Sequence, residues 1–397
     1  MSLTLTLASQ SGFQGQVTLQ VTEGGQPPTW LSPTSVERTL NVPAGGQVQQ
    51  TLNVAIAPDA PAGPHTLKVG VVYGEGSAER DLTVTVTPLW TIVEPVVDPS
   101  LLKVKYSNGR FLALSALWQT QRLQDIWISA DGRTWSRVSI DPGESRLSDI
   151  AYDGSGTYLA VGPDSTVLQS QDGQTWSRVN TPFSRFAVLT SVVYAAGKWV
   201  LGSNYGIHLY DGTDWQTIVP TGQDHALDDA LFVAYGNGKF VVAGRGVGSN
   251  QSGVGEGLVI YTSEDGVTWR QTFFYRDPYY STAYPRSLIY DAEEGRFLLA
   301  GDTQGNISQF FVFASPDGNR WQPIHGGGLP VATRVRGLAF GSGTYLLIIE
   351  RPEGPVVYSI NPGVSGERRE PISGIFSLAY GNSQFIGVGT SIAIRQP

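Results

Sequence analysis

The acidic and histidine side chains that could bind a metal ion gather in one short segment. Asp224, His225, Asp228 and Asp229 lie within six residues of one another. Carboxylate oxygens are ligands that calcium prefers, but this spacing does not match an EF-hand loop, and a solvated acidic loop is the alternative. The remaining histidines are isolated in the sequence and suggest no nucleophilic triad: His65, His208 and His325. We therefore expect neither a metal ion nor another cofactor.

The segment Phe273–Arg286 has the highest density of groups suited to molecular recognition, because it is rich in tyrosine and arginine. Tyrosine offers a flat amphipathic face and arginine a planar charged fork. We predict three neighbouring loops on the same face, at Gly244–Gly257, Gln223–Asp229 and Thr181–Phe186. The candidate ligand-binding residues of these segments are Tyr275, Arg276, Tyr279, Tyr280, Arg286, Arg245, His225 and Arg185. The alternative is that the tyrosines pack over the end of a sheet.

A repeated Asp-Gly-x-x-Trp segment indicates the scaffold that carries these loops. Asp hydrogen-bonds its own turn backbone and Gly adopts the left-handed conformation, so each copy predicts a turn between two strands. The copies are Ser129–Trp135, Ser170–Trp176, Leu209–Trp215, Ser263–Trp269 and Ser315–Trp321. We interpret the aspartates (Asp131, Asp172, Asp211, Asp265 and Asp317) as structural. We expect Trp135, Trp176 and Trp269 to be buried between neighbouring blades.

A second repeat precedes each turn: a short apolar strand ending in an aromatic residue, a Gly/Asn turn and another strand. Its seven copies are Val104–Phe111, Ile150–Tyr158, Val192–Trp199, Val233–Phe240, Leu288–Phe297, Leu338–Tyr345 and Leu378–Phe385. Together the two repeats give four strands per unit. A period of this length is typical of a β-propeller, and we predict one with seven blades.

The last repeat ends after its third strand, Ser391–Ile394, and lacks a fourth. The segment Leu89–Glu94 resembles the fourth strand of the other repeats, for example Thr134–Val138. We predict that residues 89–95 pair with the last blade and close the ring, which removes open sheet edges.

Residues 1–88 have a different pattern, with alternating segments separated by Gly/Pro turns at the spacing of a β-sandwich. The turn Pro58–Gly63, which leads into a strand, and Val42–Gly46 before it resemble the immunoglobulin-like modules of bacteria. The expected fold is thus all-β, with an N-terminal Ig-like β-sandwich (1–88) and a seven-bladed propeller (89–397).

The Asp-Gly-x-Thr-Trp turns resemble the Asp-box of sialidase and BNR-type propellers, a resemblance that covers residues 89–397. That family also carries an early Arg-Ile-Pro motif, a cluster of arginines that grips a substrate carboxylate, and a Tyr–Glu pair. Arg-Ile-Pro does not occur here. Arg146, Arg245, Arg286 and Arg336 lie near the ends of predicted inner strands, but the sequence pairs them with no suitable Tyr and Glu. The resemblance therefore implies the fold and not the sialidase reaction.

Composition narrows the class of partner. The net charge is −8 and basic runs are absent, which argues against nucleic acid, and apolar runs are too short to insert into a membrane. There are no cysteines, and the N-terminus does not have the pattern of a signal peptide. We expect a non-enzymatic recognition or structural module on an extracellular surface or a phage virion, part of a larger assembly, that binds a glycan or a protein. The alternatives are a glycoside hydrolase of the sialidase-like superfamily and an assembly factor.

Overall fold

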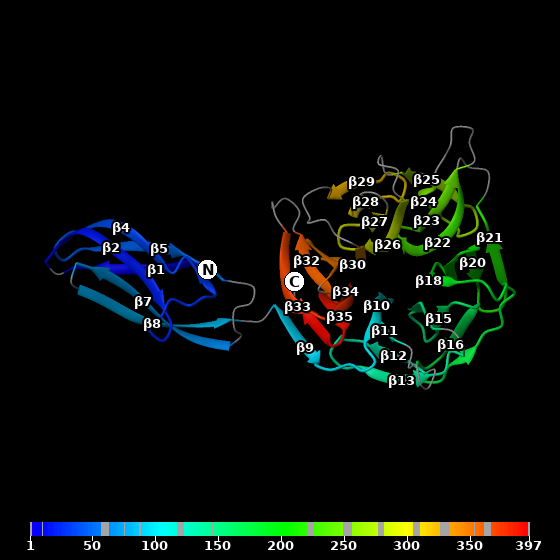
Figure 1. The fold of residues 1–397 in the computed structure, drawn as a ribbon, viewed down its shortest axis with the longest axis horizontal. Helices are drawn as coiled ribbons and strands as arrows, with labels where there is room; N and C mark the ends of the chain where they lie inside the picture. The colour runs from blue at the N-terminus through cyan, green and yellow to red at the C-terminus, as the bar shows by residue number, and fades with distance from the viewer. Residues whose placement is uncertain are drawn as a thin grey trace. The chain divides into compact units, whose positions relative to one another are not determined.

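The computed structural model describes most of the chain as β-strands. The described residues are all except 1, 10, 57–62, 75, 87–88, 117–122, 144–145, 221–224, 249–255, 277–281, 305–309, 326–333, 353, 361–366 and 396–397. They contain no helix that could cross a membrane. The chain divides into two compact units, Met1–Leu89 and Trp90–Pro397 (Figure 1).

The N-terminal unit pairs its strands into one four-stranded and two two-stranded sheets, in the orders β4-β2-β7-β8, β1-β5 and β3-β6. Its strands are β1 (Ser2–Ala8), β2 (Phe13–Thr22), β3 (Leu31–Ser32), β4 (Ser35–Val42), β5 (Gln47–Asn53), β6 (Ala55–Ile56), β7 (Gly63–Tyr73) and β8 (Gly76–Val86). Val21, Leu52 and Leu67 of three different strands share one buried cluster. The strand β4 was not predicted from the sequence, and its central residues Glu37–Thr39 are exposed.

The C-terminal unit consists of four-stranded antiparallel sheets, most of them built from strands that follow one another in sequence. The first three contain β10 (Leu101–Ser107), β11 (Arg110–Ser115), β12 (Gln124–Ser129), β13 (Ser136–Ile140), β14 (Asp149–Tyr152), β15 (Tyr158–Gly162), β16 (Thr166–Ser170), β17 (Ser177–Arg178), β18 (Leu189–Ala195), β19 (Lys198–Ser203), β20 (Gly206–Tyr210) and β21 (Trp215–Ile218). The next three contain β22 (His225–Gly236), β23 (Lys239–Gly248), β24 (Glu256–Ser263), β25 (Arg270–Tyr275), β26 (Thr282–Asp291), β27 (Arg296–Gln304), β28 (Phe310–Ser315), β29 (Gln322–His325), β30 (Arg334–Gly341), β31 (Thr344–Arg351), β32 (Gly354–Ile360) and β33 (Glu367–Ser373).

The last sheet, which we call the closing sheet, has the order β34-β35-β36-β9. It combines β34 (Ile375–Gly381), β35 (Gln384–Gly389) and β36 (Ile392–Arg395) with β9 (Trp90–Glu94) from the other end of the unit. Trp90 lies opposite Arg395, and Glu94 opposite Ile392. The predicted pairing of this segment with the last sheet is therefore present.

The first strands of these sheets contact one another in a closed ring, from β10 through β14, β18, β22, β26 and β30 to β34 and back to β10 (Figure 1). Apolar side chains fill the space between neighbouring sheets. One cluster joins Phe111 of the first sheet to Ile386 of the closing sheet, and another joins Leu159 of the second sheet to Trp199 of the third. The first strands therefore surround a common centre.

The repeated tryptophans lie at the margin of these clusters. Trp135, Trp176 and Trp269 pack against residues of two neighbouring sheets, as expected, but they are only partly buried. The prediction that they are buried between neighbouring blades is therefore met only in part, whereas the equivalent Trp321 is buried, with its Nε1 donating to the Gly318 carbonyl at 3.0 Å. Trp135 Nε1 donates to the Gly132 carbonyl at 2.9 Å, and Trp269 Nε1 to the Gly266 carbonyl at 2.7 Å.

The repeated aspartates form turns, as predicted. Asp131 Oδ1 accepts the backbone N–H groups of Arg133 and Thr134, both at 2.8 Å, and Gly132 has a φ of 71°. The Thr134 and Arg133 N–H groups lower the pKa of Asp131 to about 2. The other four aspartates each accept two N–H groups in the same way: Asp172, Asp211, Asp265 and Asp317.

Two segments that we predicted as loops are largely strands. His225–Asp229 belongs to β22, and Gly244–Gly248 belongs to β23. The two segments pair with each other, with His225 opposite Gly248 and Asp229 opposite Arg245. This pairing satisfies their backbone groups and lengthens the hairpin, which a sequence rich in glycine and acidic residues does not suggest. The tip of the Gly-rich segment, residues 249–255, lies outside the described residues.

Candidate functional site

Most of the inner strands carry an irregularity at the same place. In β10, β18, β22, β26, β30 and β34, the register with the second strand shifts by one residue, two positions before the repeated segment that ends in an aromatic residue. Such a β-bulge changes the direction of the side chain it carries. The residues at this position are Leu102, Thr190, Leu231, Arg286, Arg336 and Phe376.

A cavity of about 510 Å³ lies among the inner strands, and four of the bulged residues line it: Leu102, Arg286, Arg336 and Phe376. They follow the connection that leads from the fourth strand of one sheet to the first strand of the next. We call this end of the sheets the loop end, because the connections between second and third strands also lie there. The Asp-Gly turns lie at the other end, the turn end.

Carboxylates hold the two arginines of the cavity in place. Arg286 Nε and Nη2 donate to the two oxygens of the buried Asp302 carboxylate at 2.8 and 3.0 Å. Arg336 Nη2 donates to Glu350 Oε1 at 2.8 Å, and its guanidinium lies 5.8 Å from the centre of the Phe376 ring. Because each guanidinium has a carboxylate partner, both are ordered charged groups beside exposed or half-exposed apolar side chains.

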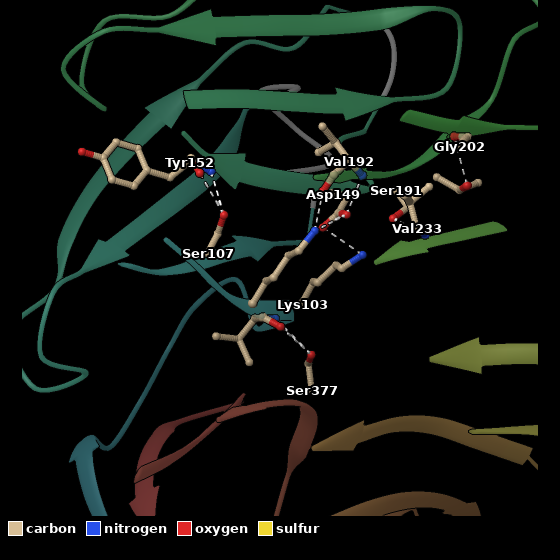
Figure 2. Close-up of polar contacts among 12 residues, drawn as sticks. Lys103, Ser107, Asp149, Tyr152, Ser191, Val192, Gly202, Val233 and Ser377 are labelled. Carbon is tan, nitrogen blue, oxygen red and sulfur yellow. Dashed lines mark hydrogen bonds and ion pairs between the residues drawn. The ribbon is translucent and has the colours of Figure 1, made fainter. Parts of the chain in front are cut away.

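A second charged group lines the same cavity, where two lysines of β10 meet one carboxylate of β14 (Figure 2). Lys103 Nζ lies 3.0 Å from Asp149 Oδ1, and Lys105 Nζ lies 3.0 Å from Asp149 Oδ2. Lys105 Nζ also donates to the Val192 carbonyl of β18. We call Lys103, Lys105 and Asp149 the lysine cluster.

Asp149 is ionised in this environment. Its burial raises the pKa, but the two lysines and the Val192 N–H, which donates to Oδ2 at 2.9 Å, together hold the pKa below its usual value. Burial lowers the pKa of Lys105, and the Asp149 carboxylate opposes this effect. The lysine side chains are 29% and 23% exposed, whereas that of Asp149 is 1% exposed, so the ammonium groups are the part of the cluster that the cavity reaches.

The position of Asp149 has a structural role that recurs in the repeat. Ser377, Asp149 and Ser191 occupy equivalent positions in their inner strands, and each accepts the backbone N–H of a residue in the next inner strand (Figure 2). The donors are Val104 at 3.0 Å, Val192 at 2.9 Å and Val233 at 3.1 Å. These side chains therefore bond consecutive sheets together around the cavity.

The loop end of the third sheet, β18–β21, carries a group of exposed apolar side chains. Leu189 lies opposite Ser203, Ser203 opposite Gly206, and Ile207 opposite Ile218, so the residues just beyond them meet at one end of the sheet. These neighbours are Val188, Tyr205 and Val219, and Phe186 joins them because Asn204 Nδ2 donates to its carbonyl. We call Phe186, Val188, Tyr205 and Val219 the apolar patch; they are 62%, 36%, 48% and 50% exposed.

Hydrogen bonds fix the segment that presents this patch. The N–H of Ser165, in the second sheet, donates to the Ala187 carbonyl at 2.9 Å. The N–H of Val188 donates to Asn204 Oδ1 at 2.8 Å. The loop therefore has defined contacts with two sheets, and its exposed side chains are presented from an ordered backbone.

The structure places some of the predicted ligand-binding residues near these features. Arg185 is exposed and lies over the ring of Phe186, 4.9 Å from its centre, beside the apolar patch. Arg286 lines the cavity. Arg245 forms an ion pair with Asp229 at 3.1 Å in the extended hairpin. His225 begins β22, and its side chain lies outside the described residues.

One part of the tyrosine-rich segment packs against other aromatic residues, and another part lies outside the described residues. The ring of Tyr275 lies 5.5 Å from that of Phe311 and 5.2 Å from that of Phe313, so it packs between two sheets and not over the end of one. Arg276, directly after β25, is exposed. Tyr279 and Tyr280 lie outside the described residues.

Sequence reasoning missed the lysine cluster and the apolar patch. The lysines alternate along β10 like solvent-facing residues, and Asp149 follows them by more than forty residues. One signal was available: aligning the inner repeats would have shown Lys103 and Lys105 at positions where the other copies carry small, apolar or hydroxyl side chains with one acidic exception. The patch has no sequence motif.

Comparisons with known proteins agree with this architecture. No family model matches the chain, and no curated protein is significantly similar to it in sequence. Among solved structures, YCF48 bound to D1 peptide is 14% identical with a TM-score of 0.50, and the match covers 79% of this chain and 98% of that one. YCF48 from Cyanidioschyzon merolae is 14% identical with a TM-score of 0.53, covering 78% of this chain and 99% of that one.

A third similar structure is a catalytically inactive virginiamycin B lyase from Staphylococcus aureus with quinupristin. It is 8% identical with a TM-score of 0.56, and the match covers 78% of this chain and 99% of that one. These neighbours are β-propellers. The described structure is thus all-β and has a β-propeller fold, and identities this low support the fold alone.

Proposed function

We propose that this protein is a non-enzymatic recognition module that binds the surface of another protein through the loop end of its propeller. In this proposal the sheets of residues 89–397 are seven Asp-box blades, and residues 1–88 are an Ig-like sandwich that serves as a stalk or an attachment. The module acts on an extracellular surface or a virion, as part of a larger assembly.

The apolar patch is the observation that carries this proposal. Eleven large apolar side chains are exposed among the described residues, and four of them gather at the loop end of one sheet. Isolated exposed apolar residues are ordinary, whereas a contiguous group with a polar margin marks an interaction surface. The hydrogen bonds of Val188 and Ala187 order the patch before a partner binds, which reduces the entropy cost of association.

The composition of the patch favours a protein over a glycan. Two valines and a phenylalanine offer no hydrogen-bonding groups, whereas sugar recognition combines aromatic faces with many polar partners. Arg185 above Phe186 adds a residue type that is enriched at protein interfaces. The peptide-bound YCF48 structure shows that a propeller of similar fold holds a peptide.

A glycoside hydrolase remains the second candidate, because one acid in the cavity has the property that a general acid needs. Burial raises the pKa of Asp291, and Glu293 lines the same cavity. Glu293, however, accepts the Ser342 N–H at 2.6 Å and the Tyr380 hydroxyl at 2.7 Å. Turnover of a glycan by the protein, lost in Asp291→Asn, would establish this candidate.

The test of the proposal compares two valines of similar exposure at opposite ends of the sheets. Val219 belongs to the patch and is 50% exposed; Val267 lies in an Asp-Gly turn and is 39% exposed. We expect Phe186→Ser and Val219→Ser to weaken capture of the protein partner, found by crosslinking in the source assembly, and Val267→Ser to leave it unchanged. A glycan array run in parallel reports binding of sugars instead. Equal binding by all three variants would contradict the proposal.

A further inference from the structure

We propose that the lysine cluster is an oxyanion-binding site, which receives a carboxylate or phosphate group of the ligand that enters the propeller cavity. This inference rests on the proposed function, since it names the chemistry of the group that the partner inserts. The geometry of Lys103, Lys105 and Asp149 carries the inference, and none of these residues belongs to the apolar patch.

Lys103 departs from a hydrogen-bonding pattern that three of the other inner strands share. Ser377, Asp149 and Ser191 use this position of the inner strand to accept an N–H from the next strand, whereas Phe232 and Gly337 at the same position have no side-chain acceptor. A lysine ammonium has three donors and no acceptor, so Lys103 cannot make that bond. Positions that depart from a locally favourable rule are expected where function requires it.

Lys105 departs from the repeat in the same way. The equivalent positions of the other inner strands carry small or apolar residues: Ala151, Val193, Ala234, Ile289, Ala339 and Ala379. An apolar side chain at this position avoids the desolvation that lowers the pKa of Lys105. Two consecutive inward positions of a single strand therefore both carry ammonium groups where the repeat carries none.

The basic side chains of the cavity differ in how their charges are matched. Arg286 is matched by Asp302 and Arg336 by Glu350, one carboxylate to each guanidinium. Lys103 and Lys105 share the single carboxylate of Asp149. The lysine cluster therefore holds one positive charge in excess, although the acids Asp291 and Glu293 also line the cavity, Asp291 lying 3.7 Å from Arg296.

The Lys103 ammonium also has hydrogen-bond donors to spare. Asp149 is the one partner of the Lys103 ammonium among the described residues, which leaves two of its N–H groups for another acceptor. Asp149 Oδ2 accepts hydrogen bonds from Lys105 and the Val192 N–H, and Oδ1 contacts Lys103 as an ion pair. An oxyanion in the cavity would accept charge-assisted hydrogen bonds from the remaining N–H groups of Lys103 and would neutralise the excess positive charge.

The test uses the full chain with two small probes, citrate for carboxylate and inorganic phosphate, at constant ionic strength set with chloride. Binding is measured by calorimetry and by protection of Lys103 from acetylation, read by mass spectrometry on the wild-type protein. Variants are Lys103→Gln, Lys103→Arg and Asp149→Asn. The matched control is Lys239→Gln, because Lys239 is 25% exposed, pairs with Glu264 and begins the second strand of its sheet, β23, outside the cavity.

We expect saturable binding of at least one probe, about tenfold weaker in Lys103→Gln, since the loss of one charge-assisted hydrogen bond corresponds to about 1.4 kcal/mol. Lys103→Arg should retain it, and Asp149→Asn, which removes the competing carboxylate, should strengthen it. Citrate or phosphate should also protect Lys103 from acetylation without any substitution.

The inference is overturned if neither probe binds saturably, if Lys103→Gln and Lys239→Gln bind alike, or if Asp149→Asn weakens binding in a folded protein. Weakening in Asp149→Asn would mean that the cluster only ties β10 to β14. None of these measurements uses the protein partner. Their failure is thus distinct from failure of the proposed function, which is read from the variants of the apolar patch.

Discussion

The closing sheet and the third sheet have the same four-stranded antiparallel form, but their last strands are held differently. In the third sheet, β21 follows β20 after a short turn in which Asp211 Oδ1 accepts two backbone N–H groups. In the closing sheet, β9 comes from the other end of the unit, and no turn joins it to β36. The short turn positions β21 next to β20, whereas β9 must be positioned next to β36 by contacts of its side chains.

A buried polar group provides that recognition. Glu370, in β33 of the preceding sheet, has Oε2 within hydrogen-bonding distance of Trp90 Nε1 at 2.9 Å and Arg395 Nε at 3.1 Å. Trp90 and Arg395 are opposite each other in the β9–β36 register. A single carboxylate thus joins the two strands that chain connectivity does not join. Buried polar groups of this kind specify register, because a shifted pairing leaves a charge without its partner.

Removing the closing strand β9 should reduce the stability of the propeller more than any other change proposed below. Deleting residues 1–88 leaves β9 in place, and we expect a folded propeller. Deleting residues 1–96 removes β9, exposes the edge of β36 and leaves the Glu370 carboxylate without Trp90, so we expect aggregation or a large fall in melting temperature. Melting curves and light scattering distinguish the two. Equal stability would show that closure does not depend on β9.

Removing the Glu370 carboxylate should cause the next largest loss of stability. Glu370→Ala leaves the Arg395 guanidinium, whose side chain is 9% exposed, without its counter-charge, and we expect a loss of about 3–5 kcal/mol in the free energy of unfolding. Glu370→Gln keeps an acceptor for Trp90 and Arg395 and should cost less than half as much. Chemical denaturation of both variants measures the difference. Similar losses in both would mean that packing, and not the charge, closes the ring.

The third sheet should respond to acid through His208 in its third strand. His208 is 1% exposed, with Ser203 Oγ 2.8 Å from one ring nitrogen and Thr217 Oγ1 2.9 Å from the other. Burial lowers its pKa from 6.5 to about 4. Between these two values the unfolded chain binds a proton that the native protein does not. Stability is therefore complete above pH 6.5 and falls as the pH approaches 4, by up to about 3 kcal/mol.

Denaturation of the wild type and His208→Gln across this pH range measures the effect. Glutamine keeps donor and acceptor groups for Ser203 and Thr217 but does not titrate. The difference between the two proteins should thus shrink or reverse as the pH falls. Parallel curves for both would show that His208 contributes nothing to the acid response.

The comparison also explains what the sequence could predict. The turn aspartates Asp131 and Asp172 act within three residues of themselves, so local spacing was enough to predict them. The pairing of β9 was predictable because its residues imitate a fourth strand that the last repeat lacks. Glu370, Lys103 and Asp149 act between sheets, across distances in sequence that no local pattern encodes. The extended hairpin of β22 and β23 was missed because its glycines and acids suggest a loop.

The smallest loss of stability is expected from a substitution in the Asp-Gly turn of the third sheet. Asp211→Ala removes the acceptor of the Thr213 and Asp214 N–H groups, both at 2.8 Å, but these groups are exposed and water replaces the carboxylate. Gly212, with a φ of 104°, keeps the turn geometry, and Tyr210 still stacks on Trp215 with ring centres 4.2 Å apart. We expect a fall in melting temperature smaller than that of Glu370→Gln, recovered in part by Asp211→Asn. A fall as large as that of Glu370→Ala would mean that the third sheet, like the closing sheet, depends on one polar group to place its last strand.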